Sequence, residues 1–78
     1  MEYHISTHSN VQRNPTQYFT GLKTWDEVRD FLTNKLDQWC YEVFIYKYSS
    51  NHRLLGRKRV TMFDLVNVAN SPNDKCLI

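Results

Sequence analysis

Apolar and polar side chains alternate at every second position in several stretches of the chain, which is the pattern of β-strands with one buried face. EYHIST (residues 2–7) alternates in this way, with Tyr3 and Ile5 between polar neighbours, while YEVFIYKY (residues 41–48) is a strand by composition, since it is rich in β-branched and aromatic residues. The turn residues SSNH that follow it predict a hairpin with the next extended segment. The predicted strands cover residues 2–7, 16–20, 41–48 and 53–60.

A helical period replaces this alternation in the middle of the chain. Apolar side chains recur there at helical spacing, and Thr24 with Glu27 forms a capping box in front of them. The sequence therefore predicts one main amphipathic helix over about residues 25–38. Its apolar stripe consists of Trp25, Val28, Phe31, Leu32, Leu36 and Trp39.

The last predicted element is a short helix over residues 62–70, although the valines in this segment suit a strand equally well. As a helix it would turn Phe63, Val66 and Ala69 inward. Ser71-Pro72 would end it, and residues 72–78 are predicted to form a flexible C-terminal tail.

These elements predict a single compact α+β domain over residues 1–71. A small antiparallel β-sheet of about three to four strands packs against the main helix, because that arrangement buries both apolar stripes. The expected order of elements is β-β-α-β-β-(α). With 14% aromatic residues, the chain has enough apolar area for a core without a metal or a disulfide.

The register of the predicted hairpin decides which of its side chains share a face. With SSNH as a four-residue loop, Tyr48 lies opposite Arg53, and one face carries aromatic and arginine side chains while the other meets the helix. A slip by one residue would bury Arg57 and Arg59 without partners, which costs several kcal/mol each. A bulge at Gly56 would do the same, so we expect neither.

Charge is segregated along the chain. Residues 47–59 hold five of the ten Lys and Arg and none of the eight Asp and Glu, so the rest of the chain carries a formal charge of −3. Such asymmetry bears on partners and association rates and not on fold.

The aromatic and basic face of the hairpin is the predicted partner-binding surface. Tyr and Arg are enriched at the hot spots of protein interfaces, and aromatic rings beside guanidinium groups also stack bases and neutralise phosphates. A simpler interpretation is a solvated hairpin whose charges protect a sheet edge. The candidate residues are Phe44, Tyr46, Tyr48, Arg53, Arg57 and Arg59.

A second candidate surface is the acidic side of the main helix. Asp26, Asp30 and Asp37 share this side, with Glu27 beside them. They would grip a basic groove on a partner or imitate a run of phosphates. The simpler interpretation is a solvated helix face with Arg29 and Lys35 nearby.

No arrangement of residues predicts catalysis, a metal site or a cofactor. The three histidines have no fixed pairing with a cysteine or carboxylate, and the two glycines cannot build a phosphate-binding loop. The two cysteines have neither metal-ligand nor redox spacing. Without a secretory signal or a membrane-spanning stretch, the expected location is the cytoplasm, that of the host if the chain is phage-encoded.

A compact, aromatic-rich α+β chain of this style resembles the small accessory proteins that phages and mobile elements encode, anti-CRISPR proteins among them. The resemblance rests on no particular motif, and it implies a protein that occupies a surface of a host enzyme or defence complex.

Three functions are therefore open. The first is a non-enzymatic binding protein that inhibits or adapts a host protein or a protein–nucleic acid complex. The second is a nucleic-acid-binding module that uses the same hairpin face. The third is a homodimer that forms through an exposed sheet edge.

Overall fold

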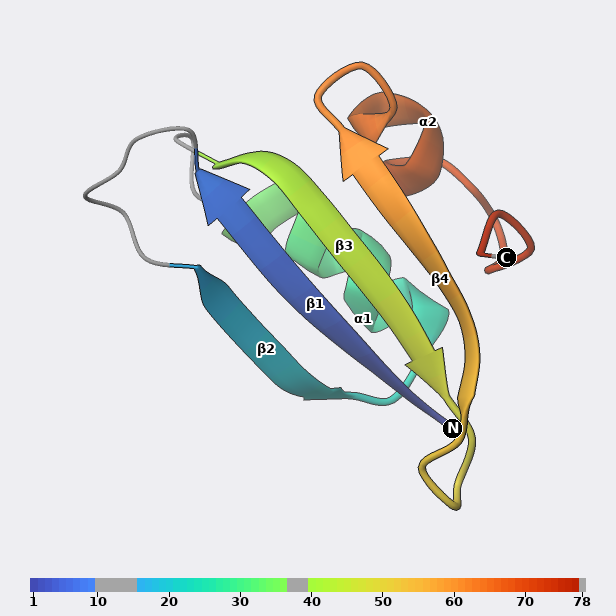
Figure 1. Ribbon diagram of the computed structural model, residues 1–78. Helices are drawn as coiled ribbons and strands as arrows, with labels where there is room; N and C mark the ends of the chain where they lie inside the picture. Colours follow the sequence, from blue (N-terminus) through green and yellow to red (C-terminus); the bar gives the residue numbers. More distant parts are fainter. Residues whose placement is uncertain (10–15, 37–39, 78) are drawn as a thin grey trace.

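The computed structural model describes residues 1–9, 16–36 and 40–77, and its centre is a four-stranded antiparallel sheet with α1 lying across one face (Figure 1). The strand order is β2-β1-β3-β4, so β1 and β3 are central and β2 and β4 are the edges. The predicted α+β class and order of elements are confirmed. The elements are β1 (Glu2–Ser9), β2 (Gln17–Leu22), α1 (Trp25–Asp30), the π-helical segment η1 (Phe31–Lys35), β3 (Cys40–Tyr48), β4 (Leu54–Thr61) and α2 (Leu65–Ala69).

The core lies between the sheet and α1. Ile5 of β1 and Ile45 of β3 lie opposite each other in the register, and both are fully buried. Val28 of α1 is also fully buried, as expected from the helical stripe. The burial of each such side chain away from water stabilises the folded state by about 1.5–3 kcal/mol. The complete core cluster is Tyr3, Ile5, Trp25, Val28, Phe31, Leu32, Val43, Ile45, Val60 and Val68.

The main helix begins where the capping box predicts and ends at Lys35, while residues 37–39, including Trp39 of the predicted stripe, lie outside the described residues. The backbone N–H of Glu27 donates to the Thr24 hydroxyl at 3.2 Å, while the Glu27 carboxylate accepts from the backbone N–H of Lys23 at 2.9 Å. After Asp30 the hydrogen bonding widens to that of a π-helix, which breaks the 3.6-residue period. The helix stops at Lys35, and Leu36 is extended.

The β3–β4 hairpin differs from its predicted register by two residues, and two separate one-residue shifts produce the difference. The loop narrows to residues 50–52, because the His52 N–H donates to the Ser49 carbonyl and His52 then adopts a φ of 64°. A bulge follows in β4, where Tyr48 lies opposite Leu54 and Lys47 lies opposite Gly56.

Either shift alone would exchange the two faces of β4, since side chains alternate along a strand. Together they restore the predicted faces: Arg57 and Arg59 are exposed and Val60 is buried. The predicted pairing and the expected absence of a bulge are therefore wrong, while the predicted division of side chains between the faces is confirmed for these residues.

Residues 62–70 contain a helix and not a strand, but its inward face is not the predicted one. The Asp64 N–H donates to the Thr61 carbonyl, so a turn precedes the helix and shifts its phase. Val68 is buried, whereas Phe63 is 94% exposed and Val66 is 66% exposed. Of the three side chains expected inside, only Ala69 packs against the core.

Residues 72–77 lie against the body of the protein, where the sequence predicts a flexible tail. Asp74 accounts for this difference, because its carboxylate accepts a hydrogen bond from the Tyr3 hydroxyl at 2.6 Å and forms an ion pair with Lys47 at 2.6 Å. Both contacts lower the pKa of Asp74, and the contact with Lys47 has the larger effect. Cys76 and Leu77 pack against the core cluster.

The burial of Ile45 predicts a large stability effect. We expect Ile45→Ala to lower the free energy of unfolding by about 2–4 kcal/mol, because a cavity remains between the central strands and the helix. The matched control is Val66→Ala on the exposed side of α2, which should change stability by no more than about 0.5 kcal/mol. Urea denaturation followed by circular dichroism measures both, and equal losses for the two variants would contradict the packing described above.

Candidate functional site

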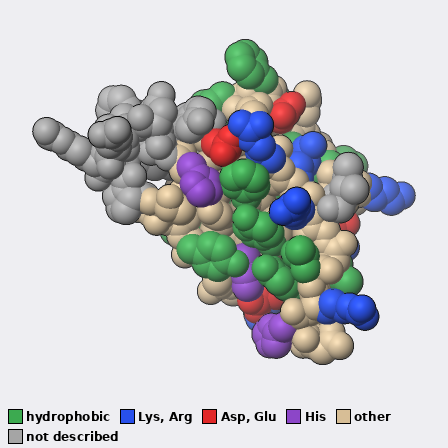
Figure 2. Space-filling view, viewed as in Figure 1, with side chains coloured by type: hydrophobic (Ala, Val, Ile, Leu, Met, Phe, Trp, Pro, Cys, Tyr) green, Lys and Arg blue, Asp and Glu red, His purple; other side chains and the backbone are tan. Residues whose placement is uncertain are grey.

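The face of the sheet that lies opposite the core is the candidate functional site, and we call it the open face. Its side chains come from the alternate strand positions that point away from Ile5 and Ile45. Figure 2 shows this face, with hydrophobic side chains gathered in a band along the sheet and basic side chains beside it. The open face includes Glu2, His4, Ser6, His8, Tyr18, Glu42, Phe44, Tyr46, Tyr48, Leu54, Arg57, Arg59 and Thr61.

At the centre of the open face, two successive aromatic rings of β3 each lie beside an arginine of β4. Phe44 lies opposite Arg59, and Tyr46 lies opposite Arg57. The centroids of the two rings are 6.4 Å apart and their planes differ by 20°. Both rings are partly exposed and both arginines are exposed, so a partner can reach ring and guanidinium together.

The carboxylates of the open face already have cationic partners. Glu42 forms an ion pair with Arg59. Glu2 forms an ion pair with Lys23 at 2.8 Å and also contacts His4. In contrast, Arg57 makes no ion pair with any other residue that the structure describes. The positive charge of Arg57 is therefore available to a partner.

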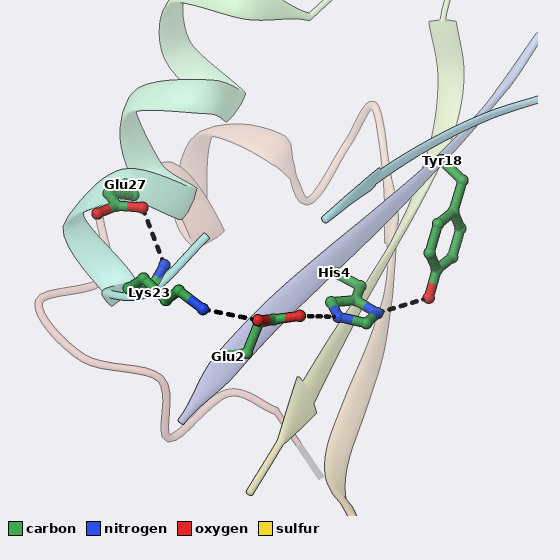
Figure 3. Close-up of polar contacts among 5 residues, drawn as sticks. All are labelled: Glu2, His4, Tyr18, Lys23 and Glu27. Carbon is green, nitrogen blue, oxygen red and sulfur yellow. Dashed lines mark hydrogen bonds and ion pairs between the residues drawn. The ribbon is translucent and has the colours of Figure 1, made fainter. Parts of the chain in front are cut away.

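A chain of polar contacts links β1 to its neighbours at one end of the open face (Figure 3). Lys23 Nζ donates to one carboxylate oxygen of Glu2, and the other oxygen contacts His4 Nε2. His4 Nδ1 lies 2.8 Å from the Tyr18 hydroxyl. The hydrogen bonds from Lys23 and then from His4 lower the pKa of Glu2 from 4.5 to about 2. Because an ionised carboxylate can only accept, His4 donates to it through Nε2 and, when neutral, accepts from Tyr18 through Nδ1.

This chain is better suited to holding the rings in place than to catalysis. A carboxylate, an imidazole and a phenol in series are ingredients of acid–base chemistry. However, burial and the nearby Tyr48 raise the pKa of Tyr18, which keeps its phenol protonated and works against a nucleophilic role. The His4 ring lies between Tyr18 and Tyr48, with centroid distances of 5.5 and 4.5 Å.

The structure brings together five of the six residues predicted to bind a partner. Phe44, Tyr46, Tyr48, Arg57 and Arg59 share the open face. The sixth, Arg53, is separated from them because the loop is shorter than predicted and Leu54 takes the place opposite Tyr48. The Arg53 backbone instead pairs with Ser49 and lies before the start of β4.

The ring-bearing residues of the open face that are missing from the sequence-based set are His4, His8 and Tyr18. The His8 ring packs edge-on against Phe44 at a centroid distance of 5.3 Å, and His8 Nε2 lies 2.8 Å from the Ser6 hydroxyl. The alternation of residues 2–7 does place His4 on one face of the strand and the buried Ile5 on the other. The missing information was that β1 lies between β2 and β3, which no local pattern reveals.

The second predicted surface does not form a continuous acidic stripe in the described residues. Asp26 and Asp30 are exposed on the helix, but Arg29 lies 3.4 Å from Asp26 and Lys35 lies 3.7 Å from Asp30. Asn34 also donates to Asp30 at 2.7 Å. Asp37 lies outside the described residues. A binding role for this surface stays a prediction.

No protein family, curated protein or solved structure matches the chain. Within residues 1–9, 16–36 and 40–77, no helix has the length and apolar character needed to cross a membrane. The same residues contain no group of three or more His, Cys, Asp and Glu placed to hold a metal ion.

The polar chain at Glu2 predicts a specific loss of stability in acid. The pKa of Glu2 is lower in the folded protein than its ordinary value of 4.5, so its contribution is fully present above that pH and is lost as the pH falls to about 2. We expect Glu2→Gln to be less stable than the wild type near neutral pH, with the difference vanishing toward pH ~2.

Urea denaturation over this pH range measures the effect. Lys23→Met removes the main partner of Glu2 and should flatten the same part of the stability profile. A Glu2→Gln variant whose stability runs parallel to that of the wild type throughout this range would contradict the role given to Glu2.

Proposed function

We propose that the protein is a non-enzymatic binding protein that holds a partner macromolecule on the open face of its sheet, and that it inhibits or adapts this partner. One observation carries the proposal: the rings of Phe44 and Tyr46 stand together with Arg57, which has no ion pair among the described residues, on the exposed side of two paired strands. Aromatic and arginine side chains of this kind contribute most of the affinity at binding surfaces, provided that they lie near the centre of the contact.

The rings are also held in place before any partner arrives. His8 packs edge-on against Phe44, and His4 packs against both Tyr18 and Tyr48. A side chain that is already ordered loses less conformational entropy on binding than a mobile one, where each immobilised side chain costs about 0.5–1.5 kcal/mol. Preorganisation therefore favours binding at this face over the interpretation of a merely solvated hairpin.

Self-association through the β4 edge is less well supported. Arg57, Lys58 and Arg59 are consecutive in this edge strand. Two copies that paired edge to edge in antiparallel fashion would bring these charges close together. Basic residues are one of the means by which natural sheets protect their edges from such pairing.

The proposal predicts that capture of the partner depends on the open face. In a pull-down from the native host, Tyr46→Ala and Arg57→Ala should each weaken binding by about 2 kcal/mol, because each removes a central contact. The matched control is Lys35→Ala, which removes a positive charge from the helix side of the protein, where Lys35 is exposed. Circular dichroism spectra equal to that of the wild type would show that the variants are folded.

If Tyr46→Ala and Arg57→Ala both retain the partners that the wild type captures, the open face is not the binding surface and the proposal fails.

A further inference from the structure

We infer that the partner held on the open face is a single-stranded nucleic acid. This inference rests on the proposed function, and it starts from a repeat in the structure. Phe44 with Arg59, and Tyr46 with Arg57, form two successive units of one ring and one guanidinium in the same order across β3 and β4. A nucleic acid strand is a polymer with one base and one phosphate in each unit, and the two repeats can be matched unit by unit.

The spacing of the rings favours a single strand over a duplex. The centroids of Phe44 and Tyr46 are 6.4 Å apart, and their planes differ by 20°. Stacked bases of a duplex follow one another at about 3.4 Å along each strand. Two neighbouring bases that each stack on one of these rings must therefore be separated from each other, which only an unpaired strand allows.

The charges of the open face suit a phosphate backbone. Glu2 and Glu42 are each held by a cation, so they present no uncompensated negative charge beside the rings. Arg57 makes no ion pair within the described residues. The ion pair with Glu42 orients the Arg59 guanidinium, which has five N–H donors and therefore retains donors for a phosphate oxygen.

A polar group for the base edges lies on the other side of the rings. Tyr18 on β2 is on the open face and is 54% exposed, whereas both ring nitrogens of His8 already lie within hydrogen-bond distance of the Ser6 and Thr16 hydroxyls. The Tyr18 hydroxyl keeps an acceptor site after it donates to a neutral His4. Arginines on one side and the Tyr18 hydroxyl on the other would thus give a bound strand a fixed orientation, with phosphates over β4 and bases over β3 and β1.

The inference is tested by fluorescence anisotropy of the full chain with a labelled single-stranded oligonucleotide, as DNA and as RNA, and with the corresponding duplex. We expect the single strand to bind at low salt at least about tenfold more tightly than the duplex. The logarithm of affinity should fall with the logarithm of salt concentration, with a slope of about −0.7 for each phosphate contacted.

Substitutions separate stacking from charge. Phe44→Leu and Tyr46→Ala should each weaken binding by about 10- to 100-fold with the salt slope unchanged, because they remove a stacking surface and no charge. Tyr46→Phe keeps the ring and should bind nearly as the wild type does. Arg57→Ala should weaken binding and make the salt slope shallower by about 0.7. Lys35→Ala, on the helix side, should change neither.

Two outcomes overturn the inference. One is the absence of measurable binding to either single strand at low salt. If Tyr46→Ala still abolishes capture of a protein in the pull-down, the proposed function stands and the partner is a protein. The other is binding of single strand and duplex with equal affinity and without sensitivity to Phe44→Leu and Tyr46→Ala, which would indicate general charge attraction and not stacking.

Discussion

The contact between Ile5 and Ile45 sets the phase of the whole sheet. These two side chains are fully buried and lie opposite each other on the central strands, so they determine which positions of β1 and β3 face the helix. Every intervening position must then face the other way, because side chains alternate along a strand. In so small a domain the two faces of the sheet differ in composition: one supplies the core, and the other carries rings and charges that are partly or fully exposed.

The polar contacts complete this division. On the core side, the carboxylate of Asp74 brings the C-terminal residues to Tyr3 and Lys47, so that a lysine on the apolar face of β3 has a counter-charge. On the open face, Glu2 and His4 hold Tyr18 beside the other rings. A buried or half-buried polar group is costly without a partner, and the described residues contain no buried side-chain nitrogen or oxygen that lacks one. Tyr18 and His4 are therefore held on the open face by the same contacts that satisfy their polar groups.

Local patterns in the sequence were sufficient to predict the elements, their order and the division of the hairpin into an aliphatic and an aromatic face. They were not sufficient for features that depend on distant parts of the chain. The place of β1 beside β3, which adds His4 and His8 to the open face, is a property of the sheet and not of either strand. The predicted register of the hairpin was wrong because of His52. This residue adopts a positive φ although it is not a glycine, and the loop is shorter as a result. The contacts of the C-terminal residues were also not predicted, because they join distant parts of the chain: Asp74 and Tyr3 are 71 positions apart.

The paired shifts in the β3–β4 hairpin also limit how this region can change in evolution. A three-residue loop and one bulge together keep the arginines of β4 on the same side as the rings of β3. The insertion or deletion of a single residue in this hairpin would turn the rest of β4 inside out, since the parity of the strand would change. Related chains should therefore tolerate length changes here only in steps of two, or as a lengthened loop accompanied by a lost bulge. Length variation, which is usually harmless in a surface turn, is thus coupled to which side chains of β4 lie on the open face.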